Sequence, residues 1–148
     1  MSKVLIADDE KNIRSSLSLA FRMEGYEVLT VENGRRALDA VERGGIDLLV
    51  LDLQMPELDG IATLGELRRR GHMLPTMILT AHGSVEKAVE ATRLGAFDFV
   101  EKPPHAEKIL LTARNALRQA RLEEENRELR SRLEELEMLL KLQQKSKD

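Results

Sequence analysis

Short apolar runs alternate along most of the chain with longer stretches in which apolar residues recur every three or four positions. Three of the five runs are almost continuously apolar, which is typical of strands buried on both faces of a parallel sheet. The stretches between them have the spacing of helices with one buried face. This alternation predicts an α/β fold, a doubly wound five-stranded parallel sheet with helices on both faces. The predicted strands are residues 4–7, 27–31, 46–51, 76–79 and 97–100.

Helical spacing also predicts which side chains face the sheet, and glycines just past the periodic stretches predict where the helices end. Ser84 is the expected N-cap of the fourth helix. The expected buried positions are Ile13, Leu17, Ala20 and Phe21, then Ala37, Leu38 and Val41, and later Val85, Val89 and Thr92; the expected helix-ending glycines are Gly25, Gly44, Gly45, Gly71 and Gly95.

The composition changes after about Ala120. Residues 121–148 contain no glycine, proline or aromatic residue, and Leu, Glu, Lys, Arg and Gln dominate. A fifth helix that begins near His105 should therefore continue into this segment. We expect one globular domain over residues 1–120 and a helical coiled-coil linker or dimerisation segment over 121–148. The stripe predicted to hold the fifth helix on the sheet is Leu110, Ala113, Leu117 and Ala120.

Beyond that stripe, the apolar positions move to another side of the helix and repeat with heptad spacing. With Asn126 and Leu133 at a positions, the g residues Arg118, Glu125 and Arg132 oppose the following e residues Glu123, Arg130 and Glu137. Each such pair joins opposite charges in a parallel, in-register dimer, and a buried Asn pair fixes the register. The fifth helix is thus predicted to extend into a parallel coiled coil. Its predicted dimer seam is Leu122, Asn126, Leu129, Leu133, Leu136 and Leu140.

Composition excludes several classes of partner. The formal net charge is −3, so no broad basic field is present to attract nucleic acid or an anionic membrane. The chain has no cysteine, which excludes disulfides and thiolate metal sites and fits a reducing compartment. No apolar run approaches the length of a membrane span. We expect a cytoplasmic protein without direct nucleic-acid contact and without a membrane partner.

Polar side chains follow four of the five predicted strands. Strand one ends in Asp8-Asp9-Glu10, strand three in Asp52, strand four in Thr80, and strand five runs into Lys102. Ligands of open parallel sheets bind at the carboxyl ends of the strands, so these residues should meet at one edge. One aspartate at a strand end is more often a helix cap or a solvated residue. Four polar strand ends together make capping a poor account of the set.

The charges at this edge point to phosphoryl transfer. The carboxylates of Asp8, Asp9 and Asp52 cannot crowd together in the ionised form without a counter-charge, because each raises the pKa of the others. A few carboxylates with carbonyls and waters suit Mg²⁺. Lys102 supplies a compact positive charge for a phosphate oxygen, and Thr80 supplies a hydroxyl donor. Asp52 is then the expected nucleophile, and it needs no general base because it is already ionised at neutral pH.

Several short segments stand in a fixed order at and after the predicted strand ends. They are Asp8-Asp9-Glu10, Leu51-Asp52-Leu53-Gln54-Met55-Pro56 with Asp59-Gly60, Thr80-Ala81 and Lys102-Pro103. Together they resemble the receiver domain of two-component response regulators. The resemblance covers about residues 1–120 and implies a flavodoxin-like domain that is phosphorylated by a histidine kinase. It implies that Asp52 is the phosphoacceptor and Asp9 a direct Mg²⁺ ligand.

The resemblance assigns further roles. Asp8 would bind Mg²⁺ directly or through water, and the backbone carbonyl of Gln54 would be another ligand, while Thr80 and Lys102 would bind phosphoryl oxygens. Phe99 stands where the family has its rotating switch aromatic, although plain core packing is an equally good account of a strand-five Phe. The Lys102–Pro103 bond is expected to be cis. The flanking residues Gln54 and His82 are expected to tune hydrolysis of the acyl phosphate.

Segments 80–89 and 95–103 look more specifically like receivers of the nitrogen-regulation and dicarboxylate-transport class, the sigma-54-dependent transcription activators. Such proteins continue into an ATPase domain and a DNA-binding domain, and residues after 120 contain neither a Gly-Lys-Ser/Thr phosphate loop nor a helix-turn-helix. We expect a piece of such a regulator, and the alternative is a stand-alone dimeric receiver without an output domain.

Two other functions share this type of sheet. A Mg²⁺-dependent phosphohydrolase usually places an aspartate two residues after its nucleophile as general acid, and Gln54 stands there instead. A nucleotide- or flavin-binding module would need a Gly-rich phosphate loop after strand one. The chain is therefore not expected to be an enzyme beyond its own phosphorylation and dephosphorylation at Asp52.

Overall fold

The computed structural model describes residues 1–81 and 85–147, with the side chain of residue 147 not described. Ser84 and His82, the predicted N-cap and the predicted tuning residue, lie outside the described residues. The strands are β1 (Lys3–Ala7), β2 (Glu27–Val31), β3 (Leu48–Asp52), β4 (Thr76–Thr80) and β5 (Asp98–Glu101). The helices are α1 (Lys11–Met23), α2 (Gly34–Glu42), α3 (Gly60–Arg69), α4 (Val85–Arg93) and α5 (Ala106–Lys147).

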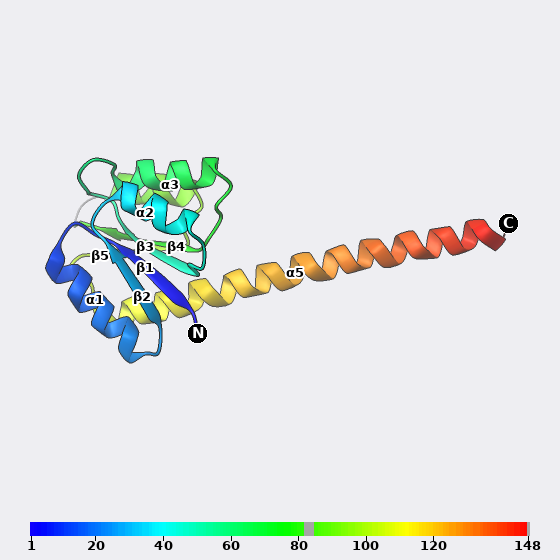
Figure 1. The fold of residues 1–148 in the computed structure, drawn as a ribbon, viewed down its shortest axis with the longest axis horizontal. Coiled ribbons are helices and arrows are strands. Elements are labelled where there is room, and N and C mark those ends of the chain that lie inside the picture. Colours follow the sequence, from blue (N-terminus) through cyan, green and yellow to red (C-terminus); the bar gives the residue numbers. More distant parts are fainter. Residues whose placement is uncertain (82–84, 148) are drawn as a thin grey trace. The chain divides into compact units, whose positions relative to one another are not determined.

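The five strands form one parallel sheet in the order β2-β1-β3-β4-β5 (Figure 1). The three central strands are buried almost throughout, whereas β2 and β5, at the two edges, are largely exposed. This difference follows from the sequence, because the central strands are the almost continuously apolar runs. The predicted doubly wound five-stranded fold is confirmed.

Helices cover both faces of the sheet (Figure 1). One buried cluster joins α2, α3 and the inner side of α4 to the sheet through residues that include Leu38, Leu64 and Ala91. The other joins α1 and the beginning of α5 to the opposite face through Phe21, Ile109 and others. Each face of the sheet therefore has its own core, which explains why residues 4–7 of β1 and 48–51 of β3 are apolar on both faces.

The prediction for α4 is wrong about which face is buried. Val85 and Val89 are 61% and 48% exposed, and α4 is buried through Ala88 and Ala91. Both sets have helical spacing, and the small alanines let the helix backbone approach the sheet closely. The third predicted position, Thr92, is exposed and its hydroxyl donates to the carbonyl of Ala88 in its own helix.

The buried stripe of α5 is also rotated from its predicted position. Ile109, Thr112, Ala113 and Ala116 are the buried residues, so only Ala113 of the predicted set is fully buried. Leu110, Leu117 and Ala120 are half-buried at the margin of the stripe. The large leucines dominated the sequence pattern, but the buried stripe consists of Ile109 and three smaller residues.

Two details of the backbone position the elements next to the site. The five glycines predicted to end helices all have positive φ, between 83° and 94°. Gly60, the first residue of α3, packs so tightly that a Cβ there would lie 2.3 Å from the carbonyl oxygen of Asp52. Only glycine allows α3 to start directly against the end of β3.

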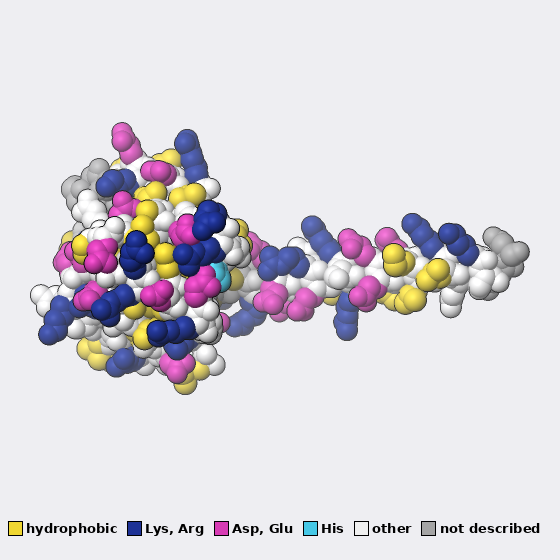
Figure 2. Space-filling model, turned by 45° about the horizontal axis from the view of Figure 1, so that its top comes forward, with side chains coloured by type: hydrophobic (Ala, Val, Ile, Leu, Met, Phe, Trp, Pro, Cys, Tyr) yellow, Lys and Arg dark blue, Asp and Glu magenta, His cyan; other side chains and the backbone are white. Residues whose placement is uncertain are grey.

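The chain divides into two compact units, Met1–Leu117 and Arg118–Asp148. Helix α5 contributes to both, since it is continuous from Ala106 to Lys147. In the second unit, all side chains from 121 to 146 are exposed, and Figure 2 shows charges of both signs and hydrophobic groups at its surface. Among the described residues, none of the helices has the length and apolarity needed to cross a membrane.

Candidate functional site

The strand register brings two aspartates together at the carboxyl edge of the sheet. Ala7 on β1 pairs with Leu51 on β3, so the residues that follow, Asp8 and Asp52, lie side by side. Both are buried, with 0% and 2% of their surfaces exposed. Two carboxylates in a buried position require a compensating charge or hydrogen bonds.

Backbone and arginine contacts hold Asp8 in place. One carboxylate oxygen, Oδ1, accepts a hydrogen bond of 2.8 Å from the backbone N–H of Glu10. Arg14 of α1 donates from Nη1 to the carbonyl of Asp8, also at 2.8 Å. The N–H of Asp8 donates to the carbonyl of Val31 at 3.2 Å. The turn from β1 into α1 is thereby fixed from both sides.

Asp52 is held in a similar way from the turn that follows β3. Its Oδ1 accepts a hydrogen bond of 3.2 Å from the N–H of Gln54. The N–H of Gly60 donates to the carbonyl of Leu53 at 3.0 Å, which returns the chain to the end of the strand. The backbone after Asp52 thus binds one carboxylate oxygen, Oδ1, and the second oxygen, Oδ2, can contact other groups.

Lys102 provides the compensating charge. Its Nζ lies 2.9 Å from Asp8 Oδ2, 3.2 Å from Asp52 Oδ2 and 3.3 Å from Glu10 Oε1, and its side chain is 15% exposed. Its backbone N–H donates to the carbonyl of Thr80 at 2.9 Å, and the following Lys102–Pro103 bond is cis. One ammonium group therefore joins the ends of β1, β3 and β5.

Burial and charge shift the ionisation of both partners. Burial, followed by the negative charge of Asp8, raises the pKa of Asp52 to about 6, although the N–H of Gln54 and the Lys102 ammonium act in the opposite direction. Burial by itself lowers the pKa of Lys102, but its contacts with Asp8 and Asp52 outweigh burial and raise that pKa. Asp52 is then mostly ionised at pH 7, as a nucleophile must be.

The carboxylates also suit a hard divalent cation. Asp8 Oδ2 and Asp52 Oδ2 are both buried, and among the described residues the contact found for each is the ion pair with the Lys102 ammonium. Asp8, Asp9 and Glu10 can each offer an oxygen within 4.8 Å of the others, and the last two are exposed. Oxygen ligands of this kind, open to solvent on one side, fit Mg²⁺ with bound waters.

The remaining predicted residues lie at or near the same edge. Thr80, the last residue of β4, is buried, and its hydroxyl donates to the carbonyl of Ala81 at 3.4 Å. Gln54 is exposed. Phe99 is 38% exposed on the edge strand β5, so its ring is not a core side chain in this conformation.

The sequence reasoning missed the contact of Glu10 with Lys102, although it had named Glu10 at the end of strand one, and it missed Arg14 altogether. The contact of Glu10 with Lys102 spans 92 positions, and no local pattern signals it. Arg14 could have been found, because it stands one helical turn after Glu10 at the start of α1 and so faces the end of β1.

Comparison with known proteins identifies the family. The model of the response regulator receiver domain family matches residues 4–114. Regulatory protein AtoC of Escherichia coli is 40% identical over 133 residues, which are 90% of this chain and 29% of AtoC. Response regulator protein FleR of Pseudomonas aeruginosa is 40% identical over 119 residues, 80% of this chain and 25% of FleR.

Solved structures agree with these relatives. The crystal structure of NtrX from Brucella abortus in complex with ADP has a TM-score of 0.82 at 36% identity, over 87% of this chain and 30% of NtrX. A receiver domain protein from Clostridium thermocellum has a TM-score of 0.78 at 30% identity, over 82% of this chain and 98% of that one.

This chain belongs to the response regulator receiver domain family, which consists of signalling domains rather than classical enzymes. The predicted resemblance is confirmed, and the curated relatives include regulatory proteins, in agreement with the predicted class. The chain spans less than a third of the length of these relatives.

The raised pKa of Asp52 predicts how Asp52→Asn changes stability with pH. A carboxyl whose pKa is higher in the folded state stabilises the fold fully below its unfolded pKa, and this stabilisation is lost as pH rises through about 6. Without divalent cations, the free energy of unfolding of Asp52→Asn should therefore equal that of wild type near pH 4. At pH 7–8 it should exceed the wild-type value by on the order of 2 kcal/mol.

Urea unfolding in EDTA across this pH range measures the difference. Asp39→Asn, on the exposed side of α2, is the matched control and should follow wild type at every pH. A variant Asp52→Asn that is less stable than wild type at pH 7–8 would show that Lys102 more than offsets the repulsion between the carboxylates.

Proposed function

We propose that this receiver accepts a phosphoryl group on Asp52 from the phosphohistidine of a histidine kinase and thereby switches the state of a dimer. The observation that carries the proposal is the pair of buried carboxylates, Asp8 and Asp52, bridged by Lys102. Such a pair is costly to bury, and a mere structural role would be served as well by apolar residues. The arrangement supports a site kept for chemistry.

The proposed step is an in-line transfer. A carboxylate oxygen of Asp52 attacks phosphorus, the bond between phosphorus and the histidine nitrogen breaks, and the imidazole leaves with the electron pair. The product is an acyl phosphate on Asp52. Lys102, already 3.2 Å from the Asp52 carboxylate, would neutralise a phosphoryl oxygen, and the Thr80 hydroxyl would donate to another.

Asp8, Asp9, Asp52 and the backbone carbonyl of Gln54 would hold the magnesium ion. When bound, Mg²⁺ supplies positive charge to the carboxylates and to the transferring phosphoryl group. Asp9 is exposed next to the buried Asp8, which suits a ligand that faces an ion entering from solvent.

Thr80 and Phe99 are the proposed switch residues. Thr80 lies at the site, at the end of a strand that pairs with β5. A movement of Thr80 toward a phosphoryl group can therefore displace residues of this neighbouring edge strand. The exposed ring of Phe99 is then free to turn inward. The reading of Phe99 as plain core packing is not supported by its 38% exposure.

The residues of the site do not favour the alternative function, a Mg²⁺-dependent phosphohydrolase. The position two residues after Asp52 holds Gln54, whose side chain cannot donate a proton as an acid and whose backbone N–H binds the Asp52 carboxylate. We therefore propose no catalysis beyond phosphorylation and dephosphorylation of Asp52 itself.

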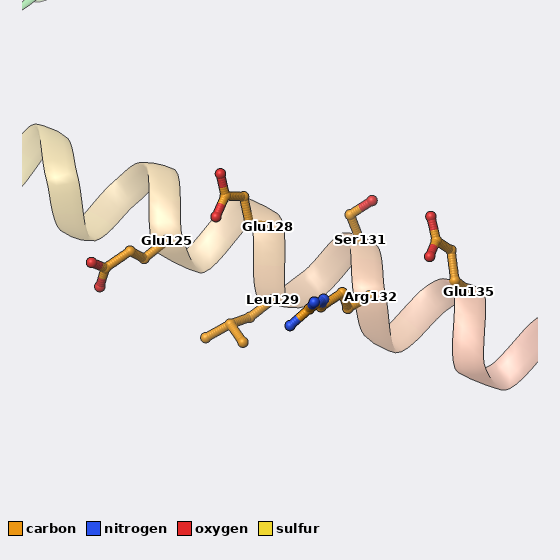
Figure 3. Close-up of a pocket in the computed structure, with 6 residues that line it drawn as sticks. All are labelled: Glu125, Glu128, Leu129, Ser131, Arg132 and Glu135. Carbon is orange, nitrogen blue, oxygen red and sulfur yellow. The ribbon is translucent and has the colours of Figure 1, made fainter.

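We further propose that residues 1–120 form the receiver and that residues 121–148 dimerise as a parallel coiled coil. The seam leucines of the second unit are 56–61% exposed in the single chain, and such side chains need a partner. Figure 3 shows Leu129 on the same side of the helix as Glu125 and Arg132, with Glu128, Ser131 and Glu135 on the other side. This is the placement of a d residue flanked by g residues.

The charges of this segment favour the parallel orientation. The g residues Glu125 and Arg132 would meet Arg130 and Glu137 of the second copy, opposite in sign each time. Exposed pairs contribute only about 0.2–1 kcal/mol each, so they select orientation while the leucines supply most of the stability. Asn126 at an a position would fix the register.

The signal is proposed to pass to a transcription-activating ATPase and DNA-binding output of the sigma-54-dependent class, in the cytoplasm. The curated relatives, which are more than three times as long as this chain, leave ample length for such domains. The segment described here is proposed to make no direct nucleic-acid contact.

The central chemical prediction concerns phosphorylation of Asp52. Incubation with Mg²⁺ and a small acyl phosphate should add one phosphoryl group per wild-type chain, and Asp52→Asn should add none because the nucleophile is gone. Asp39→Asn should be labelled as wild type is. Intact-protein mass spectrometry measures the label, and undiminished labelling of Asp52→Asn would falsify the phosphoacceptor assignment.

The dimer is tested by disulfide crosslinking, since the chain contains no cysteine. Leu129→Cys and Leu136→Cys should each form a self-disulfide, because d residues of a parallel pair face each other at disulfide distance. Ser131→Cys, which differs by one atom and lies on the opposite side of the helix, should not.

Non-reducing electrophoresis of the oxidised proteins gives the result. If crosslinks form only in mixtures of Leu122→Cys with Leu140→Cys, the pair is antiparallel and the proposed register is lost. Equal crosslinking of Ser131→Cys would show random collision of single helices.

A further inference from the structure

Glu10 occupies the N-cap position of α1 but does not cap the helix. Its side chain makes no capping hydrogen bond. Asn33 and Asp59, at the same position of α2 and α3, accept hydrogen bonds of 2.9 Å and 2.8 Å from N–H groups of the first turn. The Glu10 carboxylate instead accepts a hydrogen bond of 3.3 Å from Lys102. The Glu10 side chain therefore contacts Lys102 and does not stabilise the first turn of α1.

Lys102 is shared by three carboxylates of unequal burial. Asp8 and Asp52 are buried, whereas the Glu10 side chain is 58% exposed. The ammonium group has three donors, and it lies between the two inner carboxylates and one at the solvent side of the site.

A divalent cation in the proposed site competes with this arrangement. It requires the buried carboxylates of Asp8 and Asp52, which the Lys102 ammonium now neutralises. Two cations held against the same two carboxylates repel each other strongly in a partly buried position. Lys102 stands on a flexible four-carbon stem and can withdraw. Of its three partners, Glu10 is the one outside the ligand set proposed above, which consists of Asp8, Asp9, Asp52 and the backbone carbonyl of Gln54.

We propose that Glu10 is a positioning residue that retains the Lys102 ammonium at the rim of the site when a divalent cation occupies the inner carboxylates. This inference rests on the proposed metal site. Without Glu10, the displaced ammonium loses the one of its three carboxylate partners that lies outside the proposed ligand set, and cation binding is weakened. With Glu10, Lys102 stays within reach of an incoming phosphoryl group.

The test is a double-mutant cycle on Mg²⁺ affinity, measured with the full chain by amide chemical shifts during a titration with Mg²⁺ alone. Glu10→Gln should weaken Mg²⁺ binding about fivefold in the wild-type background. In a Lys102→Gln background the same change should have less than about a twofold effect, because no ammonium is left to retain.

Glu32→Gln is the matched control. Glu32 follows β2 at the same edge of the sheet, and its carboxylate pairs with Arg36 at 3.6 Å instead of with Lys102. The substitution Glu32→Gln removes the same charge as Glu10→Gln and should change Mg²⁺ affinity less than about twofold. Because Glu10 and Glu32 are both exposed, both variants should fold, and their melting temperatures check this.

A second readout follows Lys102 directly. The ¹⁵N signal of its ammonium group should persist in Mg²⁺-saturated wild type and broaden through solvent exchange in Glu10→Gln. Equal weakening by Glu10→Gln in both backgrounds, or none in wild type, would overturn the role of Glu10 while leaving the metal site intact. Failure of wild type to bind Mg²⁺ would overturn the metal site and this inference with it.

Discussion

Two carboxylates are buried side by side at the carboxyl edge of the sheet, because the register that pairs Ala7 with Leu51 makes Asp8 and Asp52 neighbours. Their repulsion is offset by the Lys102 ammonium, which reaches both from the end of β5, and by hydrogen bonds from the backbone N–H groups of Glu10 and Gln54. Three strands thus depend on one cation for their charge balance. A site balanced in this way responds to any added charge, whether a divalent cation or a phosphoryl group.

The structure supports this arrangement with unusually tight backbone packing. Gly60 starts α3 directly against the carbonyl of Asp52, and hydrogen bonds from Gln54 and Glu10 hold one oxygen of each aspartate. The second oxygen of each faces the Lys102 ammonium. At the other end of the chain, the leucines of the proposed dimer seam are exposed in the single chain, and a second copy is proposed to cover them.

Much of the fold was predictable because its signals are local. The apolar runs gave all five strands within two residues of their observed ends, and the helix-ending glycines all have the expected backbone conformation. The strand-end residues could be placed at one edge because parallel strands share their direction. The buried faces of α4 and α5 were misplaced, since Ala88, Ala91 and Ala116 are too small to dominate a hydrophobic pattern. The contact between Glu10 and Lys102 was unpredictable, because it depends on two side chains brought together only by the completed sheet.

The central claim is that the ends of four strands form one Mg²⁺-dependent site for a phosphoryl group on Asp52. Backbone amide chemical shifts during titration with beryllofluoride, a phosphoryl analogue, test it most directly. The account predicts that beryllofluoride added to the Mg²⁺-saturated protein causes further large shifts at residues 8–10, 52–54, 80–81 and 102, and that it causes none of them without Mg²⁺ or in Asp52→Asn. Shifts that need no Mg²⁺, that persist in Asp52→Asn, or that fall away from the strand ends would contradict it.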